Sequence, residues 1–266
     1  MNISFRLDLF TNISDKKNFT SLLYAVTLGF LMSACSHGIL AIAMQLYKKG
    51  ARIPVVITFL LATPWANLPI TILLFGFFGW KAFIFILTAM VIAIVTGIIF
   101  TILEKNKLIE ESKIVNQSTY YDWANIKFFN FKQSVNGVLR GSLNLANMIL
   151  WWLLIGVFIS ALIGAYLPTN IFQDYLNSSV SGILLTLLFA SIIEVCSEGS
   201  SPIAFEIYKQ VGTLGNPFIF LMAGVVTDYT EIGLIWTTIG KRTAIWLPII
   251  TVPFVLIAAI LFNLYL

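Results

Sequence analysis

The sequence predicts an all-α, polytopic membrane protein built from two repeated modules with interrupted helices. Its composition, its long apolar runs and an internal repeat are the three observations behind this prediction. Of 266 residues, 59% are hydrophobic and 11% are charged, whereas a soluble domain carries about 25% charged residues. Since so few charged side chains cannot cover a globule in water, we expect lipid to surround most of the chain.

Seven apolar runs supply the expected membrane helices. About 20 consecutive apolar residues cross the hydrocarbon core as a helix, and a membrane β-barrel would instead show segments of about ten residues with alternating polarity. The runs here are apolar on every face. They lie at residues 19–34, 53–78, 83–103, 147–167, 181–195, 217–239 and 243–266.

The internal repeat appears when the chain is aligned with itself so that Cys35 meets Cys196. Cys-Ser-His-Gly at residues 35–38 then meets Cys-Ser-Glu-Gly at residues 196–199, and 15 of the 66 positions from residue 35 to residue 100 are identical. We therefore expect a first membrane repeat at residues 1–103, a polar cytoplasmic linker at 104–143 and a second repeat at 144–266. The run at 147–167 has no counterpart, so the first repeat is expected to lack its opening helix.

The net charge of +4 indicates membrane orientation and not nucleic-acid binding, because Lys and Arg cluster at the ends of the apolar runs. Two topologies are open. If each Cys-Ser-x-Gly segment interrupts one long span, at residues 19–47 and 181–208, the repeats run parallel, with ten basic residues on one side and six on the other. If each segment is instead the tip of a re-entrant hairpin, the repeats are inverted.

The interruptions at the two Cys-Ser-x-Gly segments form the candidate binding site. Gly weakens a helix and Pro removes a backbone donor, and free helix ends at membrane depth are tolerated only where protein or a water-filled cavity satisfies them. Such ends bind ions and substrates in transporters, although kinks that serve only helix packing are the alternative. The substrate-binding candidates are Cys35, His37, Cys196, Glu198 and Asn67.

Two kinds of side chain among these candidates have distinctive chemistry. Thiolates prefer soft partners, so Cys35 and Cys196 would suit a soft solute, unless both are small buried hydrophobes. His37 is the sole histidine and titrates near neutrality. It is therefore a candidate proton carrier or ligand, with a buried and hydrogen-bonded structural histidine as the alternative.

Asp228 and Glu231 are three residues apart and so share one helix face. Two carboxyl groups close together in a low-dielectric span cannot both ionise cheaply, and charged residues within spans are usually functional. We predict that this pair carries protons coupled to transport. A hydrogen-bonded pair of protonated acids at a helix interface is the alternative.

Several familiar enzyme motifs are missing from the sequence. It has no Gly-x-x-x-x-Gly-Lys-Ser/Thr phosphate loop, no His-Glu-x-x-His zinc motif and no Gly-x-Ser-x-Gly nucleophile motif. We therefore expect no enzymatic activity, no catalytic residue, no cofactor and no metal site. Energy for transport would come from an ion gradient, a membrane potential or a partner subunit.

Four segments carry a family resemblance: ACSHG at residues 34–38, ATPWANLP at 62–69, CSEGSSP at 196–202 and AGVVTDYTE at 223–231. They resemble the ArsP/YraQ-type permease family, and the match covers nearly the whole chain. That resemblance implies a multi-pass permease of the bacterial inner membrane, with members that export trivalent organoarsenicals and others tied to metal efflux. Many members carry Cys-Ser-Cys-Gly at the first break, where this chain has His37. Binding of a soft solute would therefore use Cys35 together with Cys196.

Sequence and resemblance together predict a secondary efflux permease that exports a small soft solute. We expect membrane lipid to surround it and no nucleic acid to bind it. The sequence leaves open whether the chain self-associates into a homo-oligomer. Two rival hypotheses are an intramembrane enzyme that uses Cys196 or His37, and a non-transporting membrane subunit. The enzyme predicts turnover without a gradient, and the subunit predicts that neutralising Asp228 or Glu231 leaves solute flux unchanged.

Overall fold

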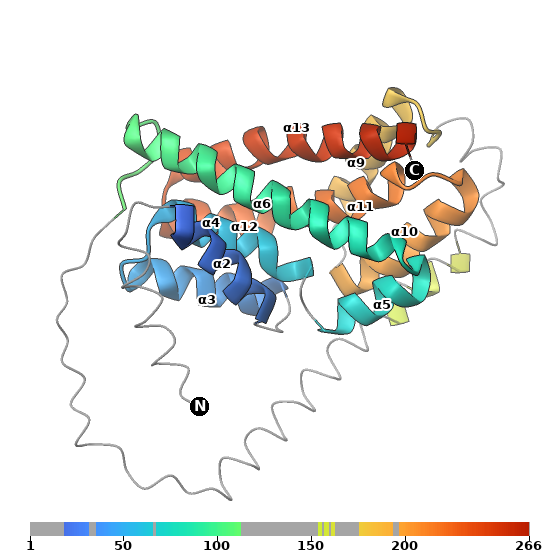
Figure 1. The fold of residues 1–266 in the computed structure, drawn as a ribbon, viewed down its shortest axis with the longest axis horizontal. Coiled ribbons are helices and arrows are strands. Elements are labelled where there is room, and N and C mark those ends of the chain that lie inside the picture. The colour runs from blue at the N-terminus through green and yellow to red at the C-terminus, as the bar shows by residue number, and fades with distance from the viewer. Residues whose placement is uncertain are drawn as a thin grey trace, which may run out of the picture.

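The chain is helical throughout the part that the computed structural model describes, with no strand there (Figure 1). That part comprises residues 19–31, 36–65, 68–112, 154–155, 157–159, 161–162, 176–193 and 197–265. The all-α prediction is confirmed for these residues.

Two sets of five helices, each in the same order, make up most of the described residues. The first set is α2 (Phe19–Leu31), α3 (Ser36–Lys48), α4 (Ile53–Ala62), α5 (Leu68–Phe78) and α6 (Lys81–Lys105), with the short 3₁₀ helix η1 (Thr63–Trp65) after α4. The second set is α9 (Val180–Ile193), α10 (Ser197–Val211), α11 (Gly215–Val226), α12 (Tyr229–Thr238) and α13 (Lys241–Tyr265). In the self-alignment that sets Cys35 on Cys196, each helix of the second set begins within one position of its counterpart in the first.

Three segments of the described residues are long and apolar enough to cross a membrane. They are α6, α13 and the combined stretch of α11 and α12 from Gly215 to Thr238. At 1.5 Å per residue, the 25 residues of α6 extend over about 37 Å, which exceeds the hydrocarbon thickness of about 30 Å. Helices α2, α4 and α9 are apolar but shorter, so none of them crosses the hydrocarbon alone.

The first two helices form a hairpin and not one long span. Near its start, α2 shares a cavity with the start of α4, because Phe19 and Leu22 line it together with Pro54 and Val55. Near its end, Gly29 lies against Thr63 just beyond α4, so α2 runs parallel to α4. Helix α3 packs on α4 and ends only a short turn before α4 begins, so α3 runs the opposite way. The chain therefore reverses between α2 and α3.

The second set contains the same hairpin. Asn216 near the start of α11 donates a hydrogen bond to the carbonyl of Asn177 just before α9 (3.2 Å), and Ser191 near the end of α9 lies 2.9 Å from Thr227 just after α11. Helix α10 packs on α11 and ends at Val211, a short turn before α11 begins. The interpretation of residues 19–47 and 181–208 as interrupted long spans is therefore wrong, and the re-entrant alternative describes the fold.

The two sets run in opposite directions. Phe85 near the start of α6 packs with Phe262 near the end of α13, with ring centroids 5.8 Å apart, and both rings contact Phe218 (5.3 and 4.9 Å). At the other end, Glu110 just after α6 hydrogen-bonds Arg242 at the start of α13. Helices α6 and α13 are consequently antiparallel, as Figure 1 shows, so the parallel arrangement is wrong and the inverted one holds.

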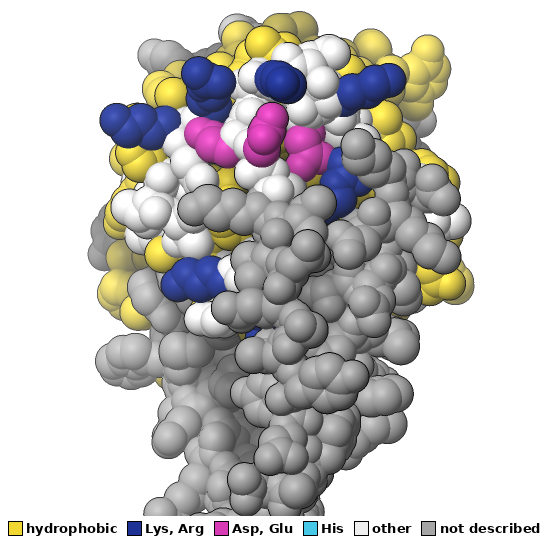
Figure 2. Space-filling view, turned by 90° about the vertical axis from the view of Figure 1, so that its left-hand side faces the viewer, with side chains coloured by type: hydrophobic (Ala, Val, Ile, Leu, Met, Phe, Trp, Pro, Cys, Tyr) yellow, Lys and Arg dark blue, Asp and Glu magenta, His cyan; other side chains and the backbone are white. Residues whose placement is uncertain are grey.

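Most basic side chains gather at one end of this fold. Seven of the nine described Lys and Arg residues lie where α3, α6 and α12 end and α4 and α13 begin, and we call this the basic end. They are Lys48, Lys49, Arg52, Lys105, Lys107, Lys241 and Arg242. Figure 2 views this end and shows Lys and Arg side chains around a group of acidic ones.

The other two described cations, Lys81 and Lys209, lie at the opposite end, where α5 and α10 end. The parallel topology would place Lys209 with Lys48, and Lys241 and Arg242 with Lys81. Both groupings are wrong, because α10 and α13 run opposite to their counterparts in the first set.

Glu110 joins the two sets at the basic end. Its carboxylate accepts hydrogen bonds from the backbone N–H of Arg242 (2.9 Å) and from the N–H and hydroxyl of Thr243 (2.9 and 2.7 Å). Burial raises the pKa of Glu110, but these hydrogen bonds outweigh it and hold the pKa below its ordinary value. The carboxylate thus stays charged at the N-terminus of α13, where the helix dipole favours an anion.

Gly97 allows α6 and α4 to approach closely, and it supplies a test of their packing. A Cβ at Gly97 would lie 1.9 Å from Thr58 Oγ1, which donates to the carbonyl of Pro54 (2.8 Å). Gly97→Ala is therefore expected to cost about 1–3 kcal/mol through overpacking, which lowers the melting temperature in detergent by roughly 3–8 °C. Gly76→Ala is the matched control, since no described atom beyond its chain neighbours and the nearby backbone of its own helix lies within 4 Å of its Cβ position. An equal response of the two variants would contradict this packing.

Candidate functional site

In the second set, the end of the hairpin's first helix meets a break between α11 and α12. Helix α11 ends at Val226, and α12 starts at Tyr229. In the break, Thr227 Oγ1 lies 2.9 Å from Ser191 Oγ near the end of α9 and 2.8 Å from the carbonyl of Ala223. A polar side chain in the break therefore contacts the helix that leads into residues 194–196.

The first set repeats this juxtaposition with different side chains. Helix α4 gives way to η1 at Thr63, and α5 starts only at Leu68. A Cβ at Gly29 near the end of α2 would lie 2.8 Å from Thr63 Oγ1, which donates to the carbonyl of Phe59 (2.5 Å). The close approach of α2 thus depends on a glycine, as the contact in the second set depends on a serine.

Asp228 caps the N-terminus of α12. Its Oδ1 accepts hydrogen bonds from the N–H of Thr230 (2.7 Å), the hydroxyl of Thr230 (2.6 Å) and the N–H of Glu231 (3.3 Å). An aspartate in this position satisfies backbone donors that the helix leaves free. Asp228 therefore has a structural role, whatever else its charge does.

Glu231 lies one turn further along α12 and is buried, with 8% of its surface exposed. Among the described residues, none hydrogen-bonds its side chain, and Asp228 is the nearby charge that acts on it. A buried carboxyl without a compensating partner is costly in an apolar environment. Such a residue within a membrane span is a candidate functional group.

Each hairpin also packs against the other set. Helix α3 contacts α12, and α10 contacts α5. Helices α3 and α12 both end at the basic end, while α5 and α10 both end at the opposite end. Each pair is therefore parallel, and all four helices begin away from both ends, which directs their partially positive N-termini toward the interior of the fold.

The structure describes only some of the sequence-predicted site residues. Cys35, Asn67 and Cys196 lie outside the described residues. His37 and Glu198 each occupy the second position of a described helix, α3 and α10 respectively, but their side chains are not described. Asp228 and Glu231 are both described and share the start of α12.

The structure also points to polar groups that the sequence reading missed. Thr227 and Ser191 form the contact between α9 and the break, and neither was a candidate. A third polar group, the indole of Trp65, does stand out in the sequence as a polar residue within the apolar run at 53–78. Its N–H, in η1, is fully buried and has no acceptor among the described residues. Thr227 could have been found from its place directly before Asp228, but no pattern in the sequence points to Ser191.

A cluster of aromatic rings joins the two sets at the end opposite the basic end, and we call it the aromatic clasp. It comprises Phe77, Phe78 and Lys81 from the first set and Phe205 and Tyr208 from the second. The rings of Phe77 and Phe205 stack at 4.9 Å, and Phe78 packs on Phe205 (5.7 Å) and Tyr208 (5.5 Å). Lys81 Nζ donates to the Tyr208 hydroxyl (2.9 Å).

Within the described residues, no three His, Cys, Asp or Glu side chains come close enough together to hold a metal ion. The described part of the site therefore consists of helix N-termini, hydroxyl groups and two carboxyl groups.

Comparison with known protein families gives a match over nearly the whole chain. The model of the ArsP family, described as a predicted permease, matches residues 5–264. The chain belongs to the ArsP family of predicted permeases. It is a membrane protein by this membership and by its apolar helices.

Two curated relatives of this ArsP-family chain have related descriptions. A protein of Streptococcus mutans, described as a proposed subunit of a two-component membrane permease complex, is 24% identical over 224 residues, which cover 83% of this chain and 72% of the relative. A Bacillus subtilis protein, "UPF0718 protein YcgR", is 24% identical over 239 residues, covering 88% and 79%. No solved structure matches.

Proposed function

We propose that this ArsP-family chain is a secondary permease whose solute path runs between the two inverted helix sets. The observation that carries the proposal is the reciprocal packing of α3 on α12 and of α10 on α5. Each pair joins one hairpin to the broken helix of the other set. Inverted repeats with interrupted helices that meet at the interface between the repeats are typical of secondary transporters.

The two sets act as two repeats in this proposal, with boundaries at residues 1–103, 104–143 and 144–266. The matching helix starts support this division, and residues 113–153 of the linker and second repeat lie outside the described ranges. The seven cations at the basic end favour a cytoplasmic location for that end under the positive-inside rule. The chain would then be a multi-pass protein of the bacterial inner membrane.

The proposed cargo is a small soft solute that is exported, such as a trivalent organoarsenical or a related metalloid or metal. Two cysteines support this class, because Cys35 precedes α3 and Cys196 precedes α10 directly in the chain. Each cysteine is therefore adjacent in the chain to an inward-directed helix N-terminus, and His37, Glu198 and Asn67 are likewise next to such a terminus in the sequence. Thiolates bind soft partners in preference to hard ones.

Accumulation of methylarsenite in everted membrane vesicles tests this cargo. The wild-type chain is expected to load vesicles above the level of empty membranes, and Cys35→Ser and Cys196→Ser are each expected to reduce loading at least ten-fold. Met44→Leu is the matched control, since it removes a buried sulfur from the same helix, α3, but two turns away from its N-terminus. If the two Cys variants load vesicles like the wild type, the thiols do not bind the cargo.

A second candidate function is a subunit that moves solute only together with another membrane protein. The description of the Streptococcus mutans relative as part of a two-component complex favours it. Reconstitution of the purified chain alone separates the two functions. Energised flux through the chain by itself would support an autonomous permease, and flux that requires a second component would support the subunit.

A further inference from the structure

The indole of Trp65 is a polar group without a hydrogen-bond partner at the break of the first helix set. The side chain belongs to η1 and is 1% exposed, and its N–H has no acceptor among the described residues. A buried donor that has left water without finding an acceptor is costly. Native structures contain few such groups, and one at a helix break is a candidate contact for a ligand.

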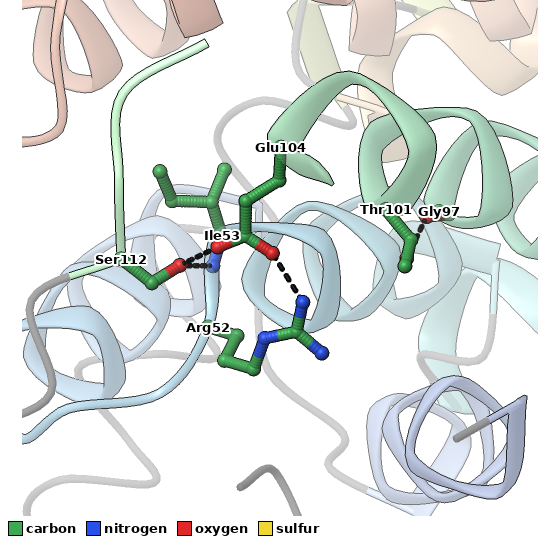
Figure 3. Close-up of polar contacts among 6 residues, drawn as sticks. All are labelled: Arg52, Ile53, Gly97, Thr101, Glu104 and Ser112. Atoms are coloured by element: carbon green, nitrogen blue, oxygen red, sulfur yellow. Dashed lines mark hydrogen bonds and ion pairs between the residues drawn. The ribbon is translucent and has the colours of Figure 1, made fainter. Parts of the chain in front are cut away.

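Polar side chains at the basic end of the same set are paired with one another. Arg52 and Ser112 both contact the carboxylate of Glu104 (Figure 3). Among the described residues, Thr96 on α6 is the other buried side chain with an unpaired polar atom. A threonine hydroxyl can rotate toward a carbonyl of its own helix, whereas an indole N–H points where the packed ring holds it. Trp65 is therefore the buried donor that needs an acceptor from elsewhere.

The position of Trp65 in the fold is beside the first half of α3. Helix η1 directly follows α4 and packs on α3. Since α3 and α4 are antiparallel and joined by a short turn at the basic end, the end of α4 lies toward the start of α3. The element that carries the indole therefore flanks the inward-directed N-terminus of α3.

Glu231 lies beside the same helix but belongs to the second set. It is in the first turn of α12, which packs on α3 and runs parallel to it. Its side chain is 8% exposed, and none of the described residues hydrogen-bonds it. Helix α3 thus packs against one element with a buried, unpaired donor and another with a buried carboxyl that no described residue hydrogen-bonds.

The corresponding positions beside α10 are apolar. In the self-alignment of the two repeats, Trp65 corresponds to Val226 and Glu231 to Ile70. Both counterparts are buried, at 1% and 0% exposed, and they lie on α11 and α5, which pack on α10. The two inverted sets therefore offer two similar interior helix starts, and at these positions α3 is flanked by polar side chains while α10 is flanked by apolar ones.

We propose that the solute is held at the start of α3 and not at the start of α10, with the indole N–H of Trp65 donating to an oxygen of the solute. A hydroxyl group fits this site, because it accepts one hydrogen bond from the indole and can donate another to the carboxylate of Glu231. Trp65 is then a specificity-determining residue that selects hydroxyl-bearing solutes. This inference rests on the proposed permease function and names the chemistry that the permease recognises.

Two soft solutes differ in the group that Trp65 would contact. Methylarsenite carries a methyl group and two hydroxyl groups on arsenic. When one thiol binds it, an As–S bond forms, one As–O bond breaks, and the thiol proton leaves with that hydroxyl as water, so one hydroxyl remains. Methylmercury hydroxide loses its single hydroxyl in the same exchange. The first solute therefore keeps an oxygen for the indole, and the second does not.

Calorimetric titration of the purified full chain in detergent tests the role of the indole. Trp65→Phe keeps an aromatic ring and removes the N–H, so it is expected to weaken methylarsenite binding at least five-fold and to leave methylmercury binding within two-fold of the wild type. Equal weakening for both solutes would show a loss of packing and overturn the inference. Unchanged methylarsenite binding would overturn it and leave the permease proposal standing, whereas no binding to the wild type would overturn the proposed cargo as well.

Nuclear magnetic resonance of indole N–H groups, together with a variant of the second set, locates the solute. The Trp65 signal, identified by its absence from the spectrum of Trp65→Phe, is expected to move downfield when methylarsenite is added, and the signal of Trp80, which is 83% exposed, should stay in place. Val226→Thr changes the aligned position beside α10 with little change of shape, so methylarsenite binding should stay within two-fold of the wild type. A Trp65 signal that does not move while methylarsenite binds, or an equal loss of binding in Val226→Thr, would contradict a solute held at α3.

Discussion

Glu231→Gln is expected to abolish accumulation of solute driven by a pH gradient, with a loss of at least ten-fold, while solute binding to the purified protein persists. Glutamine keeps the size and hydrogen-bonding capacity of the side chain but cannot release a proton. If Glu231 carries the coupled proton, the variant should also lose the dependence of solute exchange on pH. The measurement is uptake into proteoliposomes with and without an imposed pH gradient.

The expected loss follows from the surroundings of Glu231. The side chain is 8% exposed, and no described residue hydrogen-bonds it, so none of the described residues stabilises its charged form. A carboxyl in this situation changes protonation when the path around it opens or closes. Glu206 is the matched control, because it is equally buried at 8% but is paired with Lys209 (2.8 Å) and Gln210 (3.0 Å). Solute accumulation by the Glu206→Gln variant should therefore still respond to the pH gradient.

Asp228 requires two variants, because its carboxylate also caps α12. Asn caps helices as well as Asp does, whereas Ala costs about 1 kcal/mol at such a position. Asp228→Asn therefore removes the charge and keeps the cap, and Asp228→Ala removes both. Loss of coupling in both variants would assign the charge to transport. Full coupling in Asp228→Asn and in Glu231→Gln would show that this carboxyl pair is structural.

Part of this site could be read from the sequence and part could not. The spacing of Asp228 and Glu231 predicts that they share one helix face, and the structure has Glu231 in the first turn of α12 with Asp228 as its N-cap. The same segment, Asp228 to Glu231, also has the pattern of a helix-capping box, which predicts the cap that the structure shows. The contact of Thr227 with Ser191 joins residues 36 positions apart, and no local sequence pattern predicts it.

The relative direction of the helices could not be predicted from the sequence. Composition and apolar runs predict helices, and the internal repeat predicts the matching helix starts. A run that is apolar on every face has no periodicity to distinguish a hairpin from a single span, since both bury apolar side chains all round. The inverted arrangement only emerges from contacts such as Phe85 with Phe262, which lie far apart in the chain.

Opening of the aromatic clasp is the second large effect that we expect. Phe205→Ala should make the proposed solute site accessible from the end opposite the basic end, so that an impermeant maleimide labels the native cysteines at least ten-fold faster in right-side-out vesicles. The clasp joins α5 to α10, and these helices belong to different sets. Movement of one set relative to the other would have to separate these rings.

The size of the effect follows from the contacts that are lost. The ring of Phe205 stacks on Phe77 and meets the edge of Phe78, and aromatic pairs contribute about 1 kcal/mol each. Losing both pairs weakens the closed arrangement by about 2 kcal/mol, which changes the ratio of closed to open protein by roughly 30-fold. A ligand-free protein that opens this readily should also leak solute, so accumulation falls while passive exchange rises.

The control for the clasp is an aromatic pair inside one set. Phe189 and Phe220 lie 6.1 Å apart on α9 and α11, so Phe189→Ala removes a comparable contact without touching the boundary between the sets. It should leave maleimide labelling within two-fold of the wild type. If Phe205→Ala also labels like the wild type, the two sets do not separate at this end, and a solute path that opens there is excluded. If both variants label faster, the gain reflects general loosening of the fold, and the clasp has no special role.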